Sequence, residues 1–146
     1  MNILVTGCAG FIGFSLCLKL CDNKKNNIIG LDNVNNYYDT KLKKKRLNIL
    51  KKYRNFAFFK IDIAKENKLF KNFKNKKIDI IINLAAQAGV RYSIINPKTY
   101  FNSNLRGFFN ILELSKILKI KHLIFASTSS VYGNINKFPT NENTNT

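Results

Sequence analysis

The 146-residue sequence has no tryptophan, one histidine, two prolines and eight acidic residues. Its three cysteines, Cys8, Cys17 and Cys21, are odd in number and have no histidine near them, which argues against a disulfide scaffold or a zinc site. We expect them to be buried thiols in a reducing compartment. No apolar run approaches the roughly 20 residues of a membrane-spanning helix. The apolar start lacks a basic leader, so we expect no signal peptide and a cytoplasmic location.

Negative charge is scarce, and the formal net charge is +17. The excess is carried by 21 lysines, with only four arginines and 22 asparagines. Arginine is the preferred reader of phosphates and bases, and the lysines are spread over the whole chain with short clusters at residues 41–46 and 74–77. The same composition is typical of a proteome rich in A/T codons. We therefore expect no nucleic-acid partner.

A glycine motif stands at the start of the chain, where Thr6 to Gly13 read TGCAGFIG directly after an apolar run. This order predicts a strand, a tight turn and a helix start, whose free N–H groups and dipole favour an anion. Gly7 suits the turn, Gly10 lets a pyrophosphate approach the backbone, and Gly13 allows the helix to pack closely on the strand. Asp32 lies 19 residues later, where a carboxylate can accept hydrogen bonds from a ribose. The motif predicts dinucleotide binding.

Apolar runs alternate with helical patterns along the whole chain. We expect strands at residues 2–6, 27–31, 56–61, 78–83 and 122–127, and helices at 11–22, 40–53, 65–75 and 97–119. The strands are apolar throughout rather than alternating, which fits a parallel sheet covered on both faces. The sequence therefore predicts one α/β domain with a doubly wound parallel sheet. The polar residues 134–146 show no pattern and are expected to form a loop.

Polar or small residues follow strands three, four and five, at the sheet edge where ligands bind in such folds. Asp62 and Ile63 follow the third strand, residues 83–91 the fourth, and a hydroxyl-rich segment at 127–133 the fifth. The small residues could let a cofactor lie against the backbone, or simply allow close packing. The hydroxyls could donate to a reacting oxygen, or only form a turn.

These motifs resemble the N-terminal half of the extended short-chain dehydrogenase/reductases, and among them the nucleotide-sugar epimerases. The family's TGxxGxxG is at residues 6–13, its acidic strand end at Asp32 and Asn33, its next aspartate at Asp62 and its NxAA stretch at 83–86. The sequence is most similar to UDP-glucuronate 4-epimerases, which carry DNxNxYYD, AAQAGVRYS and SSVYG segments, here at residues 32–39, 85–93 and 129–133.

The resemblance implies a Rossmann-type fold, NAD as the cofactor, a UDP-sugar as substrate, no metal, and a homodimer for the full-length enzyme. No arginine follows Asp32 to neutralise a 2′-phosphate, which favours NAD over NADP. Thr128 would be the catalytic hydroxyl, with Arg91 and Ser129 on the substrate side; Arg91 could equally be a surface charge or a brace. The implied NAD-binding residues are Gly7, Gly10, Phe11, Ile12, Gly13, Asp32, Asn33, Asp62, Ile63, Leu84, Ala85, Ala86, Gln87 and Asn104.

One family element is missing, the YxxxK pair expected on a helix some 20 residues after the hydroxyl. In the family this tyrosine takes the proton of the sugar 4-hydroxyl while hydride passes from C4 to NAD and returns to the other face. The only YxxxK here, Tyr37 to Lys41, follows strand two and is interpreted as chance. We therefore expect a sheet truncated after about five strands, without the catalytic helix and the C-terminal substrate domain, and inactive alone.

Two alternatives stay open. A nucleotide-sugar 4,6-dehydratase fragment would share the cofactor half, but such enzymes commonly carry a Thr-Asp-Glu run where this sequence has Thr128-Ser129-Ser130. A non-catalytic basic binding module would use the lysines to contact a polyanion, and it would show salt-dependent binding of duplex DNA that persists in excess NAD.

Overall fold

The fold is known from a computed structural model, which describes residues 1–133 and 139–144. Within them, five strands form one parallel sheet in the order β3-β2-β1-β4-β5. The strands are β1 (Asn2–Thr6), β2 (Asn27–Asp32), β3 (Phe56–Lys60), β4 (Ile80–Asn83) and β5 (His122–Phe125). This order confirms the predicted doubly wound sheet and reverses direction between β1 and β4, which is where ligands bind in such folds.

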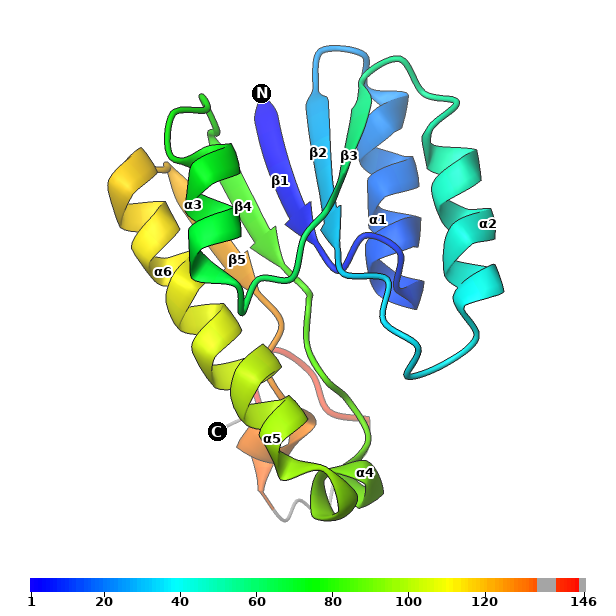
Figure 1. Ribbon diagram of the computed structural model, residues 1–146, viewed down its shortest axis with the longest axis vertical. Coiled ribbons are helices and arrows are strands. Elements are labelled where there is room, and N and C mark those ends of the chain that lie inside the picture. The colour runs from blue at the N-terminus through cyan, green and yellow to red at the C-terminus, as the bar shows by residue number, and fades with distance from the viewer. Residues whose placement is uncertain (134–138, 145–146) are drawn as a thin grey trace.

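Helices cover both faces of the sheet (Figure 1). The elements α1 (Phe11–Asp22) and α2 (Thr40–Leu50) lie on one face, and α3 (Glu66–Phe73) and α6 (Gly107–Leu118) on the other. At the carboxyl ends of the strands lie α4 (Val90–Ile95) and α5 (Pro97–Tyr100), followed by a π-helical segment, Phe101–Arg106, that leads into α6. A short 3-10 turn, Ser129–Tyr132, follows β5.

The core has two layers because successive strand residues point to opposite faces. Ile3 and Val5 of β1 belong to the layer under α1 and α2, while Leu4 between them belongs to the layer under α3 and α6. The first layer also contains Cys17, Cys21, Ile28, Leu47 and Leu50, and the second contains Leu31, Leu69, Phe73, Ile81, Ile111 and Leu114. A strand buried on both faces explains the uninterrupted apolar runs in the sequence.

The predicted elements are found with shorter ends, and one helix was missed. Five elements are one to three residues shorter than predicted: the helices at 40–53 and 65–75 and the strands at 56–61, 78–83 and 122–127. The predicted helix at 97–119 is three segments, because the chain adopts π-helical geometry at 101–106, and α4 was not predicted. Most of the loop expected at 134–146 lies outside the described residues.

The sequence predicts the helix at 97–119 from Phe101, Leu105, Phe108 and Leu112, which recur at helical spacing. Of these, Phe108 packs against the sheet, with its ring centroid 5.0 Å from that of Phe125 in β5, and the other three are exposed. Phe101, Leu105 and Leu112 are 57%, 64% and 42% exposed, whereas Ile111 and Leu114 of α6 are fully buried. The sheet is therefore covered by a different stripe of α6 than the one that marks the helix in the sequence. The exposed stripe is a surface that no described residue covers.

All three cysteines are buried free thiols, as the sequence predicted. Burial raises the pKa of the Cys17 thiol to about 12, and burial likewise raises the pKa of Cys8 and of Cys21. The reactive species of cysteine is the thiolate, so these thiols act as small apolar side chains in the core. No helix among the described residues is long and apolar enough to span a membrane.

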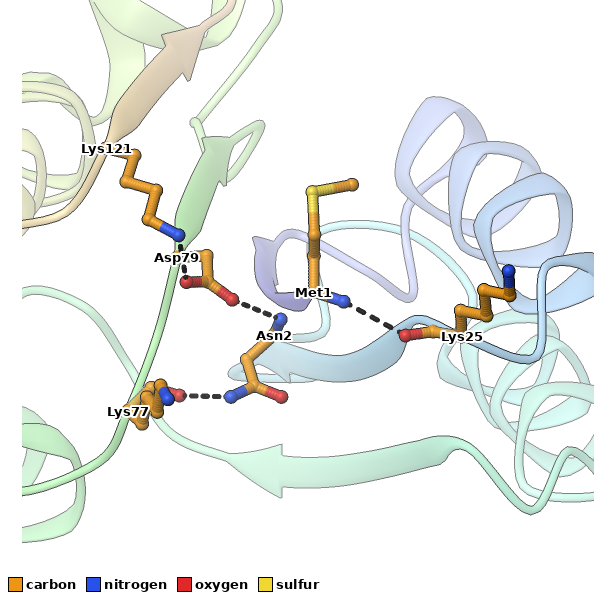
Figure 2. Close-up of polar contacts among 6 residues, drawn as sticks. All are labelled: Met1, Asn2, Lys25, Lys77, Asp79 and Lys121. Carbon is orange, nitrogen blue, oxygen red and sulfur yellow. Dashed lines mark hydrogen bonds and ion pairs between the residues drawn. The ribbon is translucent and has the colours of Figure 1, made fainter.

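Polar contacts close the amino-terminal edge of the sheet, opposite the ligand edge (Figure 2). The Asp79 carboxylate accepts hydrogen bonds from the Asn2 backbone N–H (2.9 Å) and the Lys121 ammonium (3.0 Å), joining β1 to the segments before β4 and β5. The bond from the Asn2 N–H is the main cause that lowers the pKa of Asp79. Lys121 is 79% exposed, and such surface ion pairs contribute little by themselves.

Asp79→Asn should destabilise the fold near neutral pH, because an amide has an acceptor oxygen for only one of the two donors. The folded pKa is lowered, so the stabilisation is present above the unfolded value of about 3.9 and is lost as the pH falls through the folded value. We expect the difference in urea midpoint between the two proteins to shrink as the pH drops below about 4. Asp22→Asn, at an exposed site, is the control; an equal loss there at pH 7 would contradict the role of Asp79.

Candidate functional site

The glycine motif forms a compact turn between β1 and α1. Gly7 has φ +71°, a conformation that favours glycine, and its carbonyl accepts a hydrogen bond from the Gly10 N–H (3.0 Å). A Cβ on Gly13 would collide with the Gly7 peptide, with the Gly7 carbonyl carbon at 2.8 Å. The helix therefore starts directly against the turn, and the N–H groups of its first turn have no intrahelical partner. This is the geometry of a phosphate cradle.

The Thr6 hydroxyl joins the ends of β1 and β4 beneath this turn. It donates to the Asn83 side-chain oxygen (2.7 Å) and accepts from the Leu84 and Ala85 N–H groups (3.1 and 3.0 Å). Thr6 is completely buried, so these bonds are shielded from water. A Cβ on Gly7 would lie 2.9 Å from the Ala85 nitrogen, which shows how closely the two loops approach. The crevice between β1 and β4 thus has a rigid floor.

Asp32 ends β2 beside the glycine turn and is 9% exposed. One carboxylate oxygen accepts from the Ala9 N–H (3.1 Å) and the other from the Val34 N–H (2.8 Å). Each carboxylate oxygen can accept a second hydrogen bond. Asp32 therefore fixes the glycine turn to β2 and still has acceptor capacity that faces the crevice.

Lys43 is a buried cation of this site that sequence reasoning missed. It is 5% exposed, lines the same cavity as Asp32, and donates to the Asn35 side-chain oxygen (2.7 Å) and backbone carbonyl (3.0 Å). Its ammonium lies 4.3 Å from the Tyr38 ring centroid. Burial lowers the pKa of Lys43, and the nearby Asp32 carboxylate opposes that shift. The signal was present in the sequence, since Lys43 shares the buried face of α2 with Leu47 and Leu50 at helical spacing.

The residues after β3 line the same cavity as Asp32. Asp62 accepts from the Ala64 N–H (2.9 Å) and from the Asn33 amide (3.4 Å), so the loops after β2 and β3 are joined. Ile63 is buried at the same place and lines the cavity. Asp62 and Ile63 thus lie at the sheet edge where the sequence predicted polar or small residues.

Asn104 lies on the π-helical segment, and its side chain binds the loop after β4. Its side chain accepts from the Gln87 N–H (2.7 Å) and donates to the Gln87 carbonyl (3.0 Å). These two bonds occupy the amide that the sequence placed against the cofactor, so Asn104 shapes the wall of the crevice through Gln87. Single-turn π segments are frequent at functional sites, and here the segment brings Asn104 to the loop.

Two adjoining cavities run along the carboxyl ends of the strands. The first, of about 120 Å³, contains most of the predicted cofactor residues, and the second, of about 600 Å³, extends toward β5. The two share residues 84–87 as a common wall. The predicted residues in the first cavity are Gly7, Gly10, Asp32, Asn33, Asp62, Ile63, Leu84, Ala85, Ala86 and Gln87.

The other predicted residues are placed differently. Phe11 and Ile12 are 74% and 64% exposed at the start of α1, and Gly13 lies inside that helix. Asn104 and Thr128 line the second cavity. The Thr128 hydroxyl accepts from the Ser130 N–H (3.2 Å), which is the turn-forming role weighed above.

Arg91 and Ser129 are exposed and line neither cavity. Their substrate role stays a prediction. Among the described residues no group of three or more metal-ligating side chains gathers. Tyr37, Tyr38, Asn35 and Ser103 line the first cavity and were not predicted as site residues.

Residues 4–146 match the family model described as GDP-mannose 4,6 dehydratase. A UDP-glucuronate 4-epimerase of Thermodesulfobacterium geofontis is 48% identical over 129 residues, covering 88% of this chain and 40% of that protein. A probable UDP-glucuronate 4-epimerase of Rhizobium meliloti is 43% identical, covering 95% of this chain and 40% of that protein. The chain thus spans less than half the length of these curated relatives.

A solved structure of an enzyme with the same named activity is also similar to this chain. The UDP-glucuronic acid 4-epimerase of Bacillus cereus, in complex with UDP-glucuronic acid and NAD, superposes with a TM-score of 0.83 at 34% identity. The match covers 96% of this chain and 44% of that one. Because nearly the whole chain matches the family model, the chain belongs to the GDP-mannose 4,6 dehydratase family. This family comprises the nucleotide-sugar epimerases and dehydratases among the extended short-chain dehydrogenase/reductases.

Proposed function

We propose that this chain is the NAD-binding part of a nucleotide-sugar 4-epimerase that interconverts UDP-glucuronate and UDP-galacturonate. The observation that carries the proposal is the crevice between β1 and β4, with its glycine cradle, the Asp32 carboxylate at one end and residues 84–87 at the other. Its similarity to the Bacillus cereus epimerase that binds NAD and UDP-glucuronic acid supports both cofactor and substrate.

The residues present fit an NAD molecule. A Cβ on Gly10 would lie 3.1 Å from the Gly7 carbonyl oxygen and would project into space that a pyrophosphate needs. Asp32 has acceptor capacity for ribose hydroxyls, and the two cavities share residues 84–87 and together extend from Asp32 toward β5. Asn33, Asp62 and Ile63 would line the adenosine end, and residues 84–87 the nicotinamide end.

The charges around Asp32 support NAD over NADP. A 2′-phosphate would meet the Asp32 carboxylate, and the nearby cations already have partners. Lys43 donates to Asn35, while Arg46 donates to the Ala9 carbonyl (3.2 Å) and the Tyr38 hydroxyl (3.3 Å). Both cations are therefore held by groups of the protein itself.

The chemistry is divided between this chain and the rest of a full-length protein. NAD, when bound, supplies the transient acceptance of hydride from C4 of the sugar and its return. Thr128, on the wall of the second cavity, would hydrogen-bond the reacting oxygen while its backbone position is held by the turn at Ser130. The acceptor for the proton of the sugar 4-hydroxyl would come from the part of a full-length protein that lies outside these 146 residues.

Gly10→Val and Asp32→Ala should each weaken NAD binding by the 146-residue chain. The first fills the pyrophosphate approach with methyl groups, and the second removes the ribose acceptors at a cost of about 1–3 kcal/mol. Isothermal titration with NAD, with Asp22→Ala at an exposed site as the matched control, measures both effects. Unchanged affinity in both variants would contradict the assigned cofactor site.

Thr128→Val should lower epimerase turnover by about 10²-fold, typical of a lost positioned hydrogen-bond partner. The assay requires a chain extended with the C-terminal half of the Thermodesulfobacterium geofontis relative, and follows UDP-galacturonate formation from UDP-glucuronate. Thr128→Ser keeps the hydroxyl and should be mild. Ser130→Ala removes a neighbouring hydroxyl but keeps the backbone N–H that bonds Thr128, so it is the matched control and should leave turnover unchanged. Full turnover in Thr128→Val would reduce this hydroxyl to a turn former.

The 146-residue chain alone should show no epimerase turnover and should self-associate. β5 is an edge strand within the described residues, and its Ile124 and Phe125 are 44% and 52% exposed. An exposed apolar edge favours pairing with another chain. Sedimentation velocity at increasing concentration should show larger species, and Ile124→Lys should reduce them. Turnover by the purified chain would overturn the division of chemistry proposed above.

A further inference from the structure

Three tyrosine rings connect two loops across the crevice. Tyr37 belongs to the loop after β2 and lines the first cavity, Tyr92 is on α4, and Tyr100 ends α5. The ring centroids of Tyr37 and Tyr92 are 5.0 Å apart, and those of Tyr92 and Tyr100 are 6.3 Å apart. Both pairs are tilted and lie within the range of favourable aromatic contacts. The loops they join belong to opposite sides of the point where the strand order reverses.

The loop after β2 is built to present Tyr37. Side-chain oxygens of Asp32, Asn33 and Asn35 each accept from the N–H two residues later, at 2.8, 3.0 and 3.4 Å. These successive Asx turns fix the backbone up to Tyr37. Lys43 holds Asn35 from α2 by two further bonds, so this end of the tyrosine row is anchored in the helix layer.

Tyr100, at the other end of the tyrosine row, is held by the segment that follows β4. The Tyr100 hydroxyl donates to the Ala88 carbonyl (2.8 Å) and contacts the Gly89 carbonyl. Gly89 has φ +99°, and a Cβ there would collide with the Tyr37 hydroxyl. Glycine at this position therefore allows Tyr37 to reach the segment that follows β4.

We propose that Tyr37, Tyr92 and Tyr100 form an aromatic strap that ties the β2–α2 loop to α4 and thereby retains a dinucleotide bound in the crevice. The inference rests on the proposed function for its ligand. A dinucleotide in this groove extends from Asp32 past residues 84–87, and Tyr37 lines the cavity between these ends. The Tyr37–Tyr92 contact is present in the free chain, so it would have to open both for a dinucleotide to enter and for it to leave, and the strap slows both steps.

The test uses the 146-residue chain carrying Ile124→Lys, the change expected to reduce self-association, in every variant. Release of NADH is followed by stopped-flow fluorescence after mixing with excess NAD. Tyr37→Ala and Tyr92→Ala should each speed release about fivefold, the size of one aromatic contact. The double variant should be no faster than either single one, because both remove the same contact. Tyr37→Phe keeps the ring, so it should release NADH almost as slowly as the chain with Tyr37. Tyr53→Ala, which removes a ring at the opposite edge of the sheet, should lower the unfolding midpoint without changing release.

A second measurement needs no ligand. Amide hydrogen exchange of residues 89–95 in the free chain should rise in Tyr37→Ala, because α4 loses its tie to the other loop. Unchanged exchange there would overturn the strap, whatever NADH does. Faster exchange with unchanged NADH release, or no NADH binding by the unsubstituted chain, would overturn retention as its role. Absence of NADH binding would also overturn the proposed cofactor. Unchanged release with intact NADH binding would contradict only the role of the strap and leave the cofactor assignment standing.

Discussion

The site depends on one buried hydroxyl, that of Thr6. Its three hydrogen bonds join the end of β1 to Asn83, Leu84 and Ala85 at the end of β4, where the strand order reverses. A parallel doubly wound sheet leaves a crevice at that point, and the crevice can serve as a binding site only if its two walls keep a fixed spacing. Because Thr6 is fully buried, no water competes for these bonds. The glycine turn then sits on a floor that is already rigid.

Asp32 extends this order to the next strand. A carboxylate that is 9% exposed needs hydrogen-bond partners, and the Ala9 and Val34 N–H groups supply them. Lys43 adds a buried positive charge in the same cavity, with its own partners on Asn35. The groups that would receive a ribose are thus held in place before any ligand arrives, which reduces the entropy lost on binding.

The two edges of the sheet differ in a way that the net charge of +17 hides. At the amino-terminal edge Asp79 joins neighbouring strands through the Asn2 N–H and Lys121 (Figure 2). At the carboxyl-terminal edge the linked loops leave a cavity, which is lined by two acidic side chains, Asp32 and Asp62, and by Lys43. The local field in the crevice is therefore set by a few fixed groups, while the many exposed lysines are spread over the surface.

The sequence by itself determined the strand and helix order, the glycine turn and the place of Asp32, because these follow from local apolar runs and from backbone conformations that glycine favours. It did not predict α4 or the π-helical segment, and it marked the exposed stripe of 101–112 rather than Ile111 and Leu114. Only the tertiary structure decided which distant side chains meet: Lys43 with Asn35, Asn104 with Gln87, and Tyr37 with Tyr92. Such contacts depend on the order of strands in the sheet and on the paths of the loops at their ends. Local periodicity indicates which face of a helix is buried, but it does not encode strand order or loop path.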